Sequence, residues 1–268
     1  MPLSFDHSFE LVNPDRRSRF LIICDHASNA LPDEYGTLGL DAADFEKHIA
    51  WDIGAAHITR QLADRLDCPA VLSGFSRLLI DPNRGHDDPT LVMKLSDGNI
   101  IPGNRDTDPY RDAAAWQRRI DRFHAPYHQA ITDRIEQALA DSQDAGKVPI
   151  ILSVHSFTPV WRGRQRPWEA AVLWDKDDRL PGHLFAALAK LPIVIGDNVP
   201  YSGQLKNDCL YRHGTRRGLP HALIELRQDL LGNPADCDRW LSVLSEAMHH
   251  AAEDSACDAH RHYGSHTD

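Results

Sequence analysis

No segment of the chain has the composition of a membrane span or of a secretory signal. None of the apolar runs among its 268 residues approaches the about 20 residues that a transmembrane helix needs. The first 20 residues also lack the basic and apolar regions of a signal peptide. We therefore expect a cytoplasmic protein that has no membrane partner.

Cysteine is scarce and irregularly spaced. An odd number of cysteines without a C-x-x-C pair argues against a disulfide framework and against a cysteine zinc cage. Reduced thiols are the simpler interpretation. The five cysteines are Cys24, Cys68, Cys209, Cys237 and Cys257.

Positive charge is in deficit. The chain has 29 Lys and Arg against 39 Asp and Glu, a formal net charge of -10 and a pI of about 5.8. A broad nucleic-acid surface needs a basic face that neutralises phosphates, so no nucleic-acid partner is expected. An anionic substrate would need a local cluster of arginines to overcome the general field.

Two common catalytic signatures are absent as well. The glycines form neither a G-x-G-x-x-G segment nor a P-loop, so nucleotide binding has no support. The sequence also lacks a G-x-S-x-G elbow, which disfavours a serine hydrolase.

Short apolar runs alternate with longer segments of helical periodicity. Strands that alternate with helices form a largely parallel sheet covered on both faces, and the chain has no repeat or flexible linker that would divide it. We predict one α/β/α domain over residues 1–268. The predicted strands are 20–24, 70–72, 78–80, 148–154, 170–174, 192–196 and 221–226, and the predicted helices are 41–66, 109–144, 182–190 and 235–253.

Two segments and one proline depart from this regular alternation. Residues 81–108 are rich in Pro, Gly, Asp and Asn, and an ordered loop of this length tends to be functional, for example as a lid. From about residue 258 onward several histidines crowd the chain, and we expect a disordered end there. Pro126 should kink or split the helix that contains it.

Polar side chains follow the predicted strands at the points where they end. His26, His155, Glu225 and the segment 81–84 all occupy such positions. Ligands of open α/β sheets bind beyond the carboxyl ends of the strands. These side chains are therefore expected to converge on one crevice.

His26 and His155 are the candidate metal ligands, because neutral imidazole is a good zinc donor and catalytic zinc keeps an open position for water. The alternative is that each histidine only hydrogen-bonds a loop. For the carboxylate ligand we favour Asp52, with Glu34 and Asp25 as rivals. Asp52 could instead be a carboxylate at a helix start, where it meets the helix dipole.

Glu225 ends an otherwise apolar strand, where a carboxylate is costly to bury without a purpose. Beside a metal-bound water it could act as the general base. An ion pair with Arg227 is the structural alternative. Arginine recognises carboxylates through a planar fork, and the basic groups near the strand ends are Arg77, Arg84, Arg162, Arg164 and Arg166.

Six stretches together resemble the N-formylglutamate amidohydrolase family, which is similar to zinc carboxypeptidases and aspartoacylases. The resemblance implies a three-layer α/β/α sandwich with a mixed, mainly parallel sheet. It also implies zinc-dependent hydrolysis of N-formyl-L-glutamate to formate and glutamate, a late step in histidine breakdown. The stretches are DHASNALP (25–32), HIAWDIGA (48–55), SRLLIDPNR (76–84), HSFTPVWRGRQRPWEAAVLW (155–174), NVPYSGQ (198–204) and HALIELRQDL (221–230).

The resemblance also assigns roles to individual residues. It makes His26 and His155 the metal histidines and Glu225 the general base. Asn83 and Arg84 match the pair that grips the substrate carboxylate.

A further arginine role and one departure follow from the same comparison. Arg77 matches an arginine that polarises the scissile carbonyl, and Arg166 is a second candidate for holding the carboxylate. The carboxypeptidase pattern has Glu three residues after the first histidine, where this chain has Asn29. The carboxylate ligand must then come from elsewhere, and Asp52 is our choice.

Three functional hypotheses remain at this stage. The first is a zinc amidohydrolase acting on a small anionic N-acyl amino acid. The second is a carboxypeptidase-like or aspartoacylase-like hydrolase of another N-acyl amino acid or peptide. The third is a non-catalytic metal-binding module. A monomer or a homodimer would be compatible with each of them.

Overall fold

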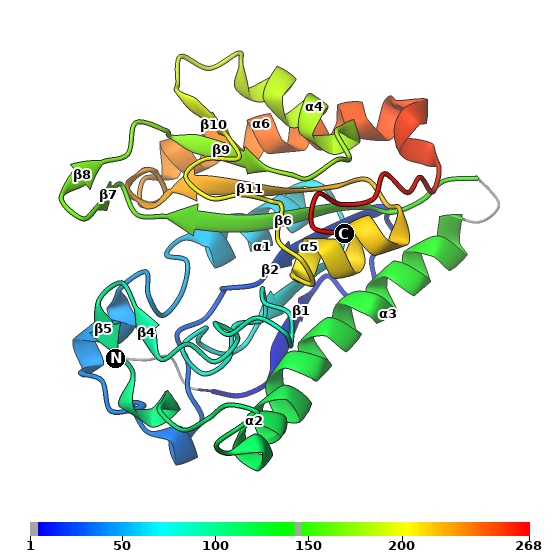
Figure 1. The fold of residues 1–268 in the computed structure, drawn as a ribbon. Coiled ribbons are helices and arrows are strands. Elements are labelled where there is room, and N and C mark those ends of the chain that lie inside the picture. Colours follow the sequence, from blue (N-terminus) through cyan, green and yellow to red (C-terminus); the bar gives the residue numbers. More distant parts are fainter. Residues whose placement is uncertain (1–4, 143–145) are drawn as a thin grey trace.

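The computed structural model describes residues 5–142 and 146–268 and contains one large sheet with helices on both faces (Figure 1). The sheet has seven strands in the order β1-β3-β2-β6-β11-β9-β10. In chain order the strands are β1 (Phe9–Val12), β2 (Phe20–Cys24), β3 (Ala70–Ser73), β6 (Ile150–Phe157), β9 (Ala170–Leu173), β10 (Ile195–Asp197) and β11 (His221–Arg227).

The middle of the sheet is parallel. β3, β2, β6 and β11 run in the same direction as one another, whereas β1 pairs with β3 and β9 pairs with β11 in antiparallel fashion. Every residue of β2, β3 and β6 is buried, as expected for strands covered on both faces. Parallel strands end at the same edge, so the residues after β2, β6 and β11 become neighbours.

One face of the sheet is covered by α1 (Ala55–Arg65), α4 (Arg179–Leu188) and α6 (Pro234–Glu253). Their apolar sides form one core with the sheet, in which Trp240 is fully buried. The Asn233 side chain accepts from the Ala235 N–H and caps α6. α6 has 20 residues, but within the described ranges no helix combines the length and apolarity needed to cross a membrane.

The opposite face packs against a long helical segment. It comprises α2 (Ala113–Arg119), a π-helical turn (Ile120–His124) and α3 (Ala125–Ser142). The π turn lies just before Pro126, whose ring cannot fit a regular helical turn, so the predicted disturbance of the helix is confirmed. The predicted helix end at residue 144 lies outside the described residues.

Smaller elements connect the strands and helices, and two hairpins project at the end of the sheet where the parallel strands finish. These hairpins are β4 (Leu95–Ser96) with β5 (Asn99–Ile100) and β7 (Val160–Trp161) with β8 (Arg164–Gln165). The short helix α5 (Cys209–His213) precedes β11. The remaining short helical turns are Asp33–Tyr35, Ala42–Glu46, Pro102–Asn104, Thr215–Arg217, Gln228–Leu230 and Ser255–Asp258.

The α/β sandwich with a mixed, mainly parallel sheet is confirmed, but three details of the prediction are wrong. The run 78–80 is a buried turn, in which the Leu79 N–H donates to the Ser76 carbonyl. An apolar run shows burial and does not by itself distinguish a strand from a turn. The segment 41–66 is helical only at its two ends, and the strand β1 was not predicted.

The C-terminal segment also differs from the expected disordered end. The Arg261 N–H donates to the Gly218 carbonyl, and Lys176 Nζ donates to the Ser265 carbonyl. The His266 ring pairs with the buried Asp175 carboxylate. The composition of this segment is polar, yet specific hydrogen bonds hold it against the body of the protein.

Candidate active site

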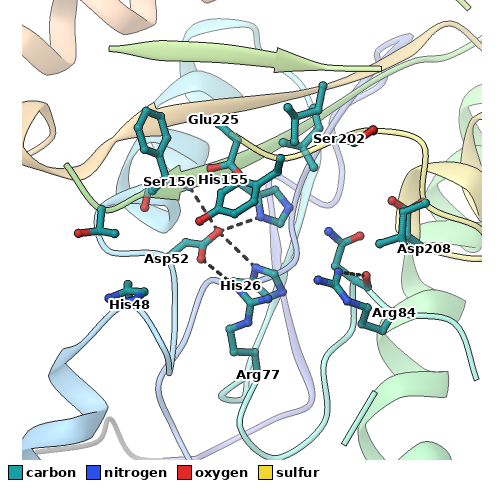
Figure 2. Close-up of a pocket in the computed structure, with 18 of the residues that line it drawn as sticks. His26, His48, Asp52, Arg77, Arg84, His155, Ser156, Ser202, Asp208 and Glu225 are labelled. Carbon is teal, nitrogen blue, oxygen red and sulfur yellow. Dashed lines mark hydrogen bonds and ion pairs between the residues drawn. The ribbon is translucent and has the colours of Figure 1, made fainter. Parts of the chain in front are cut away.

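A cavity of about 250 Å³ opens at the carboxyl ends of β2, β6 and β11. His26 follows β2 by two residues, while His155 and Glu225 lie within β6 and β11. All three side chains line the cavity, together with Asp52 from the turn before α1 (Figure 2). The strand ends therefore converge as the sequence predicts.

The two histidine rings present the same nitrogen to one carboxylate oxygen. Asp52 Oδ2 lies 3.2 Å from His26 Nδ1 and 2.8 Å from His155 Nδ1. One ligand atom from each of the three residues lies within 4.8 Å of the others, and all three residues are buried. Two imidazoles and one carboxylate form a donor set that suits a catalytic zinc ion.

The other nitrogen of each ring is held by a second aspartate. His26 Nε2 lies 2.7 Å from Asp81 Oδ1, and His155 Nε2 lies 2.8 Å from Asp25 Oδ2. A ring N–H donated to a carboxylate leaves the Nδ1 lone pair available for a metal and fixes the orientation of the ring. Both histidines thus have the hydrogen-bond partners expected of metal ligands.

Asp25 is itself fixed by neighbouring donors in the interior. Tyr127 Oη donates to Asp25 Oδ1 at 2.9 Å, and Ser153 Oγ donates to Asp25 Oδ2 at 2.8 Å. Asp25 was a rival to Asp52 as metal ligand, but its carboxylate lies behind the His155 ring. The other rival, Glu34, is exposed and pairs with Arg122.

The backbone holds Asp52 in place. The Asp52 N–H donates to the His26 carbonyl at 2.9 Å, which ties the loop after β2 to the turn before α1. Gly54 follows with a φ of 86°, a conformation that favours glycine. A Cβ atom at Gly54 would lie 2.7 Å from Leu231 Cβ, so both the conformation and the close packing require glycine.

The electrostatics of this cluster favour ionised carboxylates. Burial alone would raise the pKa of Asp25, Asp52 and Asp81, but nearby His155, His26 and Arg77 hold each pKa below its usual range, for Asp25 to about 2. Burial alone would lower the pKa of His155, yet hydrogen bonds to Asp25 and Asp52 raise it well above its ordinary value. The cluster therefore attracts positive charge.

Glu225 lies beside this cluster. β11 pairs with β6 so that Glu225 is directly opposite His155 in the register, and its side chain faces the same cavity (Figure 2). Burial raises the pKa of Glu225 to about 7, against the opposing effect of His155. Its Oε2 atom is buried and has no hydrogen-bond partner within the described part of the chain. Arg227, the alternative partner, pairs with Asp229.

The arginines divide into those that reach the cavity and those that do not. Arg77 and Arg84 line it, as does Asn83. Arg77 Nη2 lies 2.8 Å from Asp81 Oδ2, and Arg84 Nη1 donates to the Asn83 carbonyl at 2.7 Å.

The other three arginines stand outside the cavity wall. Arg166 is buried behind it, donates to Tyr201 Oη at 3.1 Å and lies over the Tyr201 ring. Arg162 and Arg164 are exposed on the β7–β8 hairpin. Arg162 lies over the Trp161 ring, and Arg166 contacts the Thr158 carbonyl as well as Tyr201. Trp161, Thr158 and Tyr201 all line the cavity.

Several residues at the site had no role assigned from the sequence. Asp81 lies in the predicted strand-end segment, but nothing in the sequence indicates that it faces His26. His48, Tyr201 and Asp208 also line the cavity. His48 and Tyr201 belong to stretches that resemble the family, so the resemblance was the available signal, whereas Asp208 is missed entirely.

Comparison with known proteins identifies the family of the chain and proteins of similar fold. The family model of N-formylglutamate amidohydrolase matches residues 18–231. The crystal structure of a gene product from Agrobacterium tumefaciens has 32% identity and a TM-score of 0.82, and the match covers 92% of this chain and 96% of that chain. N-formylglutamate amidohydrolase from Ralstonia eutropha has 20% identity and a TM-score of 0.62, with 91% and 97% covered.

The comparison with curated proteins finds no significant match. The family model nevertheless spans most of the chain, including all the strands that carry the site. This chain belongs to the N-formylglutamate amidohydrolase family.

Proposed function

We propose that this protein is a zinc-dependent amidohydrolase that cleaves the amide of a small anionic N-acyl amino acid, such as N-formyl-L-glutamate. The observation that carries the proposal is the position of Glu225. Its buried Oε2 atom has no hydrogen-bond partner among the described residues, and its carboxylate faces the cavity beside two histidines and a carboxylate that can share one metal ion. The family membership and the Ralstonia eutropha relative support the amide as the bond cleaved.

His26, His155 and Asp52 would hold the metal. Their donor set fits zinc, and the aspartates behind both rings supply the outer hydrogen bonds that such ligands require. When bound, a divalent ion lowers the pKa of a coordinated water and polarises a carbonyl oxygen.

Glu225 is the general base in this proposal. Its pKa of about 7 lies near neutral pH, where a group can both accept and donate a proton efficiently. Glu225 takes a proton from the water that attacks the acyl carbon. It then delivers this proton to the nitrogen of the departing amino acid, which leaves as a neutral amine.

The cavity wall supplies the substrate contacts. Arg84 and Asn83 would hold the substrate carboxylate, because a guanidinium forms charge-assisted bonds to that group. Arg77 is fixed by Asp81 and faces the same cavity, so its remaining N–H groups would stabilise negative charge on the acyl oxygen. Arg166 would act through Tyr201, on which it lies.

The test is a comparison of Glu225→Gln with the wild type on formyl, acetyl and peptidyl amino acids. Glutamine keeps the shape but cannot accept the proton, so turnover should fall by a factor on the order of a hundred or more while the bound metal is retained. Asp229→Asn, which breaks a partly exposed ion pair on the same strand end, is the matched control. Near-normal turnover of Glu225→Gln would remove this residue from the mechanism.

The same substrate panel distinguishes the alternatives. Preference for acetyl or peptidyl substrates would favour an aspartoacylase-like or carboxypeptidase-like enzyme. A lack of turnover on every substrate, with the metal bound, would favour a non-catalytic module.

We also propose a setting for the reaction. The five cysteines are free in the structure, which suits the reducing cytoplasm. Formate and glutamate as products would place the reaction at a late step of histidine breakdown.

A further inference from the structure

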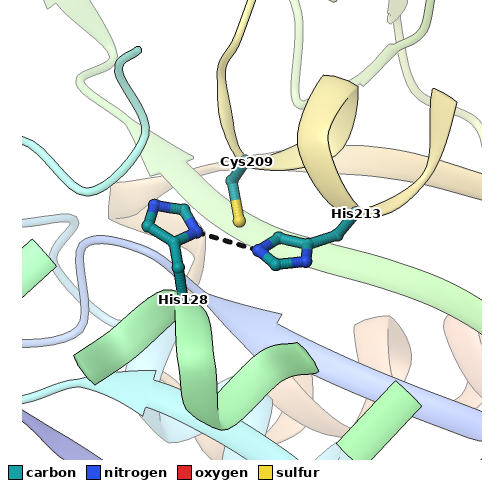
Figure 3. Close-up of side chains that lie close together, drawn as sticks. All are labelled: His128, Cys209 and His213. Atoms are coloured by element: carbon teal, nitrogen blue, oxygen red, sulfur yellow. Dashed lines mark hydrogen bonds between the residues drawn. The ribbon is translucent and has the colours of Figure 1, made fainter. Parts of the chain in front are cut away.

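A second cluster of metal-ligating side chains lies away from the cavity. His128 from α3 faces Cys209 and His213 from α5, and Figure 3 shows the Cys209 sulfur directed between the two rings. His128 Nδ1 lies 2.8 Å from His213 Nε2. One ligand atom of each residue lies within 4.8 Å of the others, and all three residues are buried.

We propose that His128, Cys209 and His213 form a second metal site, which binds one zinc-type divalent ion independently of His26 and His155. Two imidazoles and one thiolate are donors that zinc and cobalt prefer, whereas magnesium and calcium prefer oxygen. The ion would join α3 to α5. Its role would be structural, because Asp25, the carboxylate that faces Cys209, is already held by Tyr127, Ser153 and His155.

The histidines are in the state that ligation needs. His128 Nε2 lies 2.9 Å from the Pro82 carbonyl, which can only accept, so Nε2 carries the proton and Nδ1 keeps its lone pair. Burial lowers the pKa of His128 well below its ordinary value and that of His213 to about 3. Both rings are therefore neutral, and His213 needs only to move its proton to Nδ1.

The thiol of Cys209 must lose its proton to bind. Burial raises its pKa, but a coordinating thiol is deprotonated by the metal itself, and the proton goes to solvent. Ligation would replace the hydrogen bond that the thiol makes with Asp25. Asp25 keeps its other donors, Tyr127, Ser153 and His155.

The distance between the two ring nitrogens requires a small adjustment. Tetrahedral zinc separates its ligand atoms by about 3.4 to 3.6 Å, given Zn–N and Zn–S lengths of about 2.1 and 2.3 Å. The ring nitrogens of His128 and His213 would have to part by roughly 0.6 Å from their present 2.8 Å. This shift replaces the direct bond between the rings with two bonds to the ion.

The cluster also has a route to solvent. A surface cavity of about 240 Å³ is lined by both histidines, Thr132 and Arg212. It offers an entry path and room for a water at the fourth position. Arg212 and Arg217 both bring positive charge to this cavity, which opposes a cation there. Arg217 is paired with Glu136, and the thiolate of Cys209 together with the ionised Asp25 offsets the charge of Arg212.

A metal at this site would stabilise the wall of the active-site cavity. His128 binds the Pro82 carbonyl, and the Cys209 N–H donates to Asn83 Oδ1 at 3.2 Å. Pro82 and Asn83 directly precede Arg84, the residue proposed to hold the substrate carboxylate. The second ion would thus fix the segment that carries the carboxylate clamp, although its binding does not depend on the proposed reaction.

Cobalt titration of the full-length protein after metal removal tests the proposal. Of the two sites, only the second contains sulfur, so a thiolate-to-cobalt charge-transfer band in the near ultraviolet distinguishes it from the first. The wild type should bind two equivalents and show this band. Cys209→Ser should lose the band and one equivalent, whereas His155→Gln should lose one equivalent and keep the band.

The control is Cys237→Ser, which removes another buried cysteine whose thiol donates to a backbone carbonyl and should leave the band unchanged. If Cys209→Ser does not fold, His213→Gln removes a different ligand and should abolish the band. A wild type that binds one equivalent without the band overturns the proposal. A band that persists in Cys209→Ser, or in the His213→Gln variant, also overturns it.

Discussion

Replacement of Asp81 by Asn changes the charge behind the His26 ring without changing the shape of the side chain. Asp81 Oδ1 accepts from His26 Nε2 at 2.7 Å and from the Asn83 N–H at 2.9 Å. Asp81 Oδ2 accepts from Arg77 Nη2 at 2.8 Å. The carbonyl oxygen of asparagine can take the place of Oδ1. Its NH2 group would then replace Oδ2, so that a donor would face the Arg77 guanidinium, which is also a donor.

Two effects of different size follow from this geometry. Loss of an outer carboxylate costs about 10- to 100-fold in metal affinity, or roughly 1.4 to 2.7 kcal/mol. Arg77 is mostly buried, and its remaining carboxylate partner among residues 5–142 and 146–268 is Asp52 Oδ1, at 3.6 Å. The folded state should therefore lose about 3 kcal/mol, the lower end for a broken buried pair. The expected loss of metal-binding free energy is thus about half of the expected loss of folding stability, or more.

The assay is a competition between the protein and a chelating indicator for zinc, with urea unfolding of the same samples. The control is Asp238→Asn, which breaks an exposed ion pair with Arg65 at 3.3 Å and should change neither quantity measurably. If Asp81→Asn loses stability while its zinc affinity stays within twofold of the wild type, Asp81 does not support a metal ligand.

Three further predictions concern the substrate clamp, the Asp52 turn and pH. Arg84→Ala should raise KM about tenfold or more with little change in kcat, in steady-state kinetics with acidic and amide-capped substrates; an unchanged KM would place the carboxylate elsewhere. Gly54→Ala should destabilise the protein by about 2 to 5 kcal/mol in urea unfolding, from its positive φ and the clash with Leu231; a wild-type midpoint would contradict this. Burial lowers the pKa of His221, so the unfolded state binds more protons below about pH 6.5 and stability should fall there as pH drops. His221→Asn, which keeps a donor for the Leu219 carbonyl, should flatten this fall, and an identical pH profile would exclude the contribution.

Much of the site was predictable because it follows strand ends. His26, His155 and Glu225 sit at or near the ends of three buried runs, and the parallel direction of the strands brings such ends to one edge. The pairing register then sets Glu225 opposite His155. The register depends on contacts between segments that are distant in the chain. The sequence therefore predicts that these residues lie near one another, but it does not predict which residue of β6 pairs with Glu225.

The carboxylates could not be distinguished from the sequence. Asp25, Asp52 and Asp81 all lie near strand ends or helix starts, and all three are buried against the same two rings. Which of them faces the shared Nδ1 side depends on loop geometry, such as the positive φ of Gly54. A prediction from local pattern can propose Asp52 but cannot assign the other two to the outer positions.

The charges around the two rings give a physical reason for the arrangement. Three ionised aspartates contact two imidazoles in the interior, and Arg77 is the cation held by two of these aspartates. Buried carboxylates of this number need compensating positive charge. Without a metal, the raised pKa of His155 favours its protonated form, which supplies part of this charge. A divalent ion held by His26, His155 and Asp52 would replace the proton on His155 Nδ1 and supply more charge, while the outer bonds to Asp25 and Asp81 stay intact. The same aspartates that orient the rings therefore also make the position between them favourable for a metal cation.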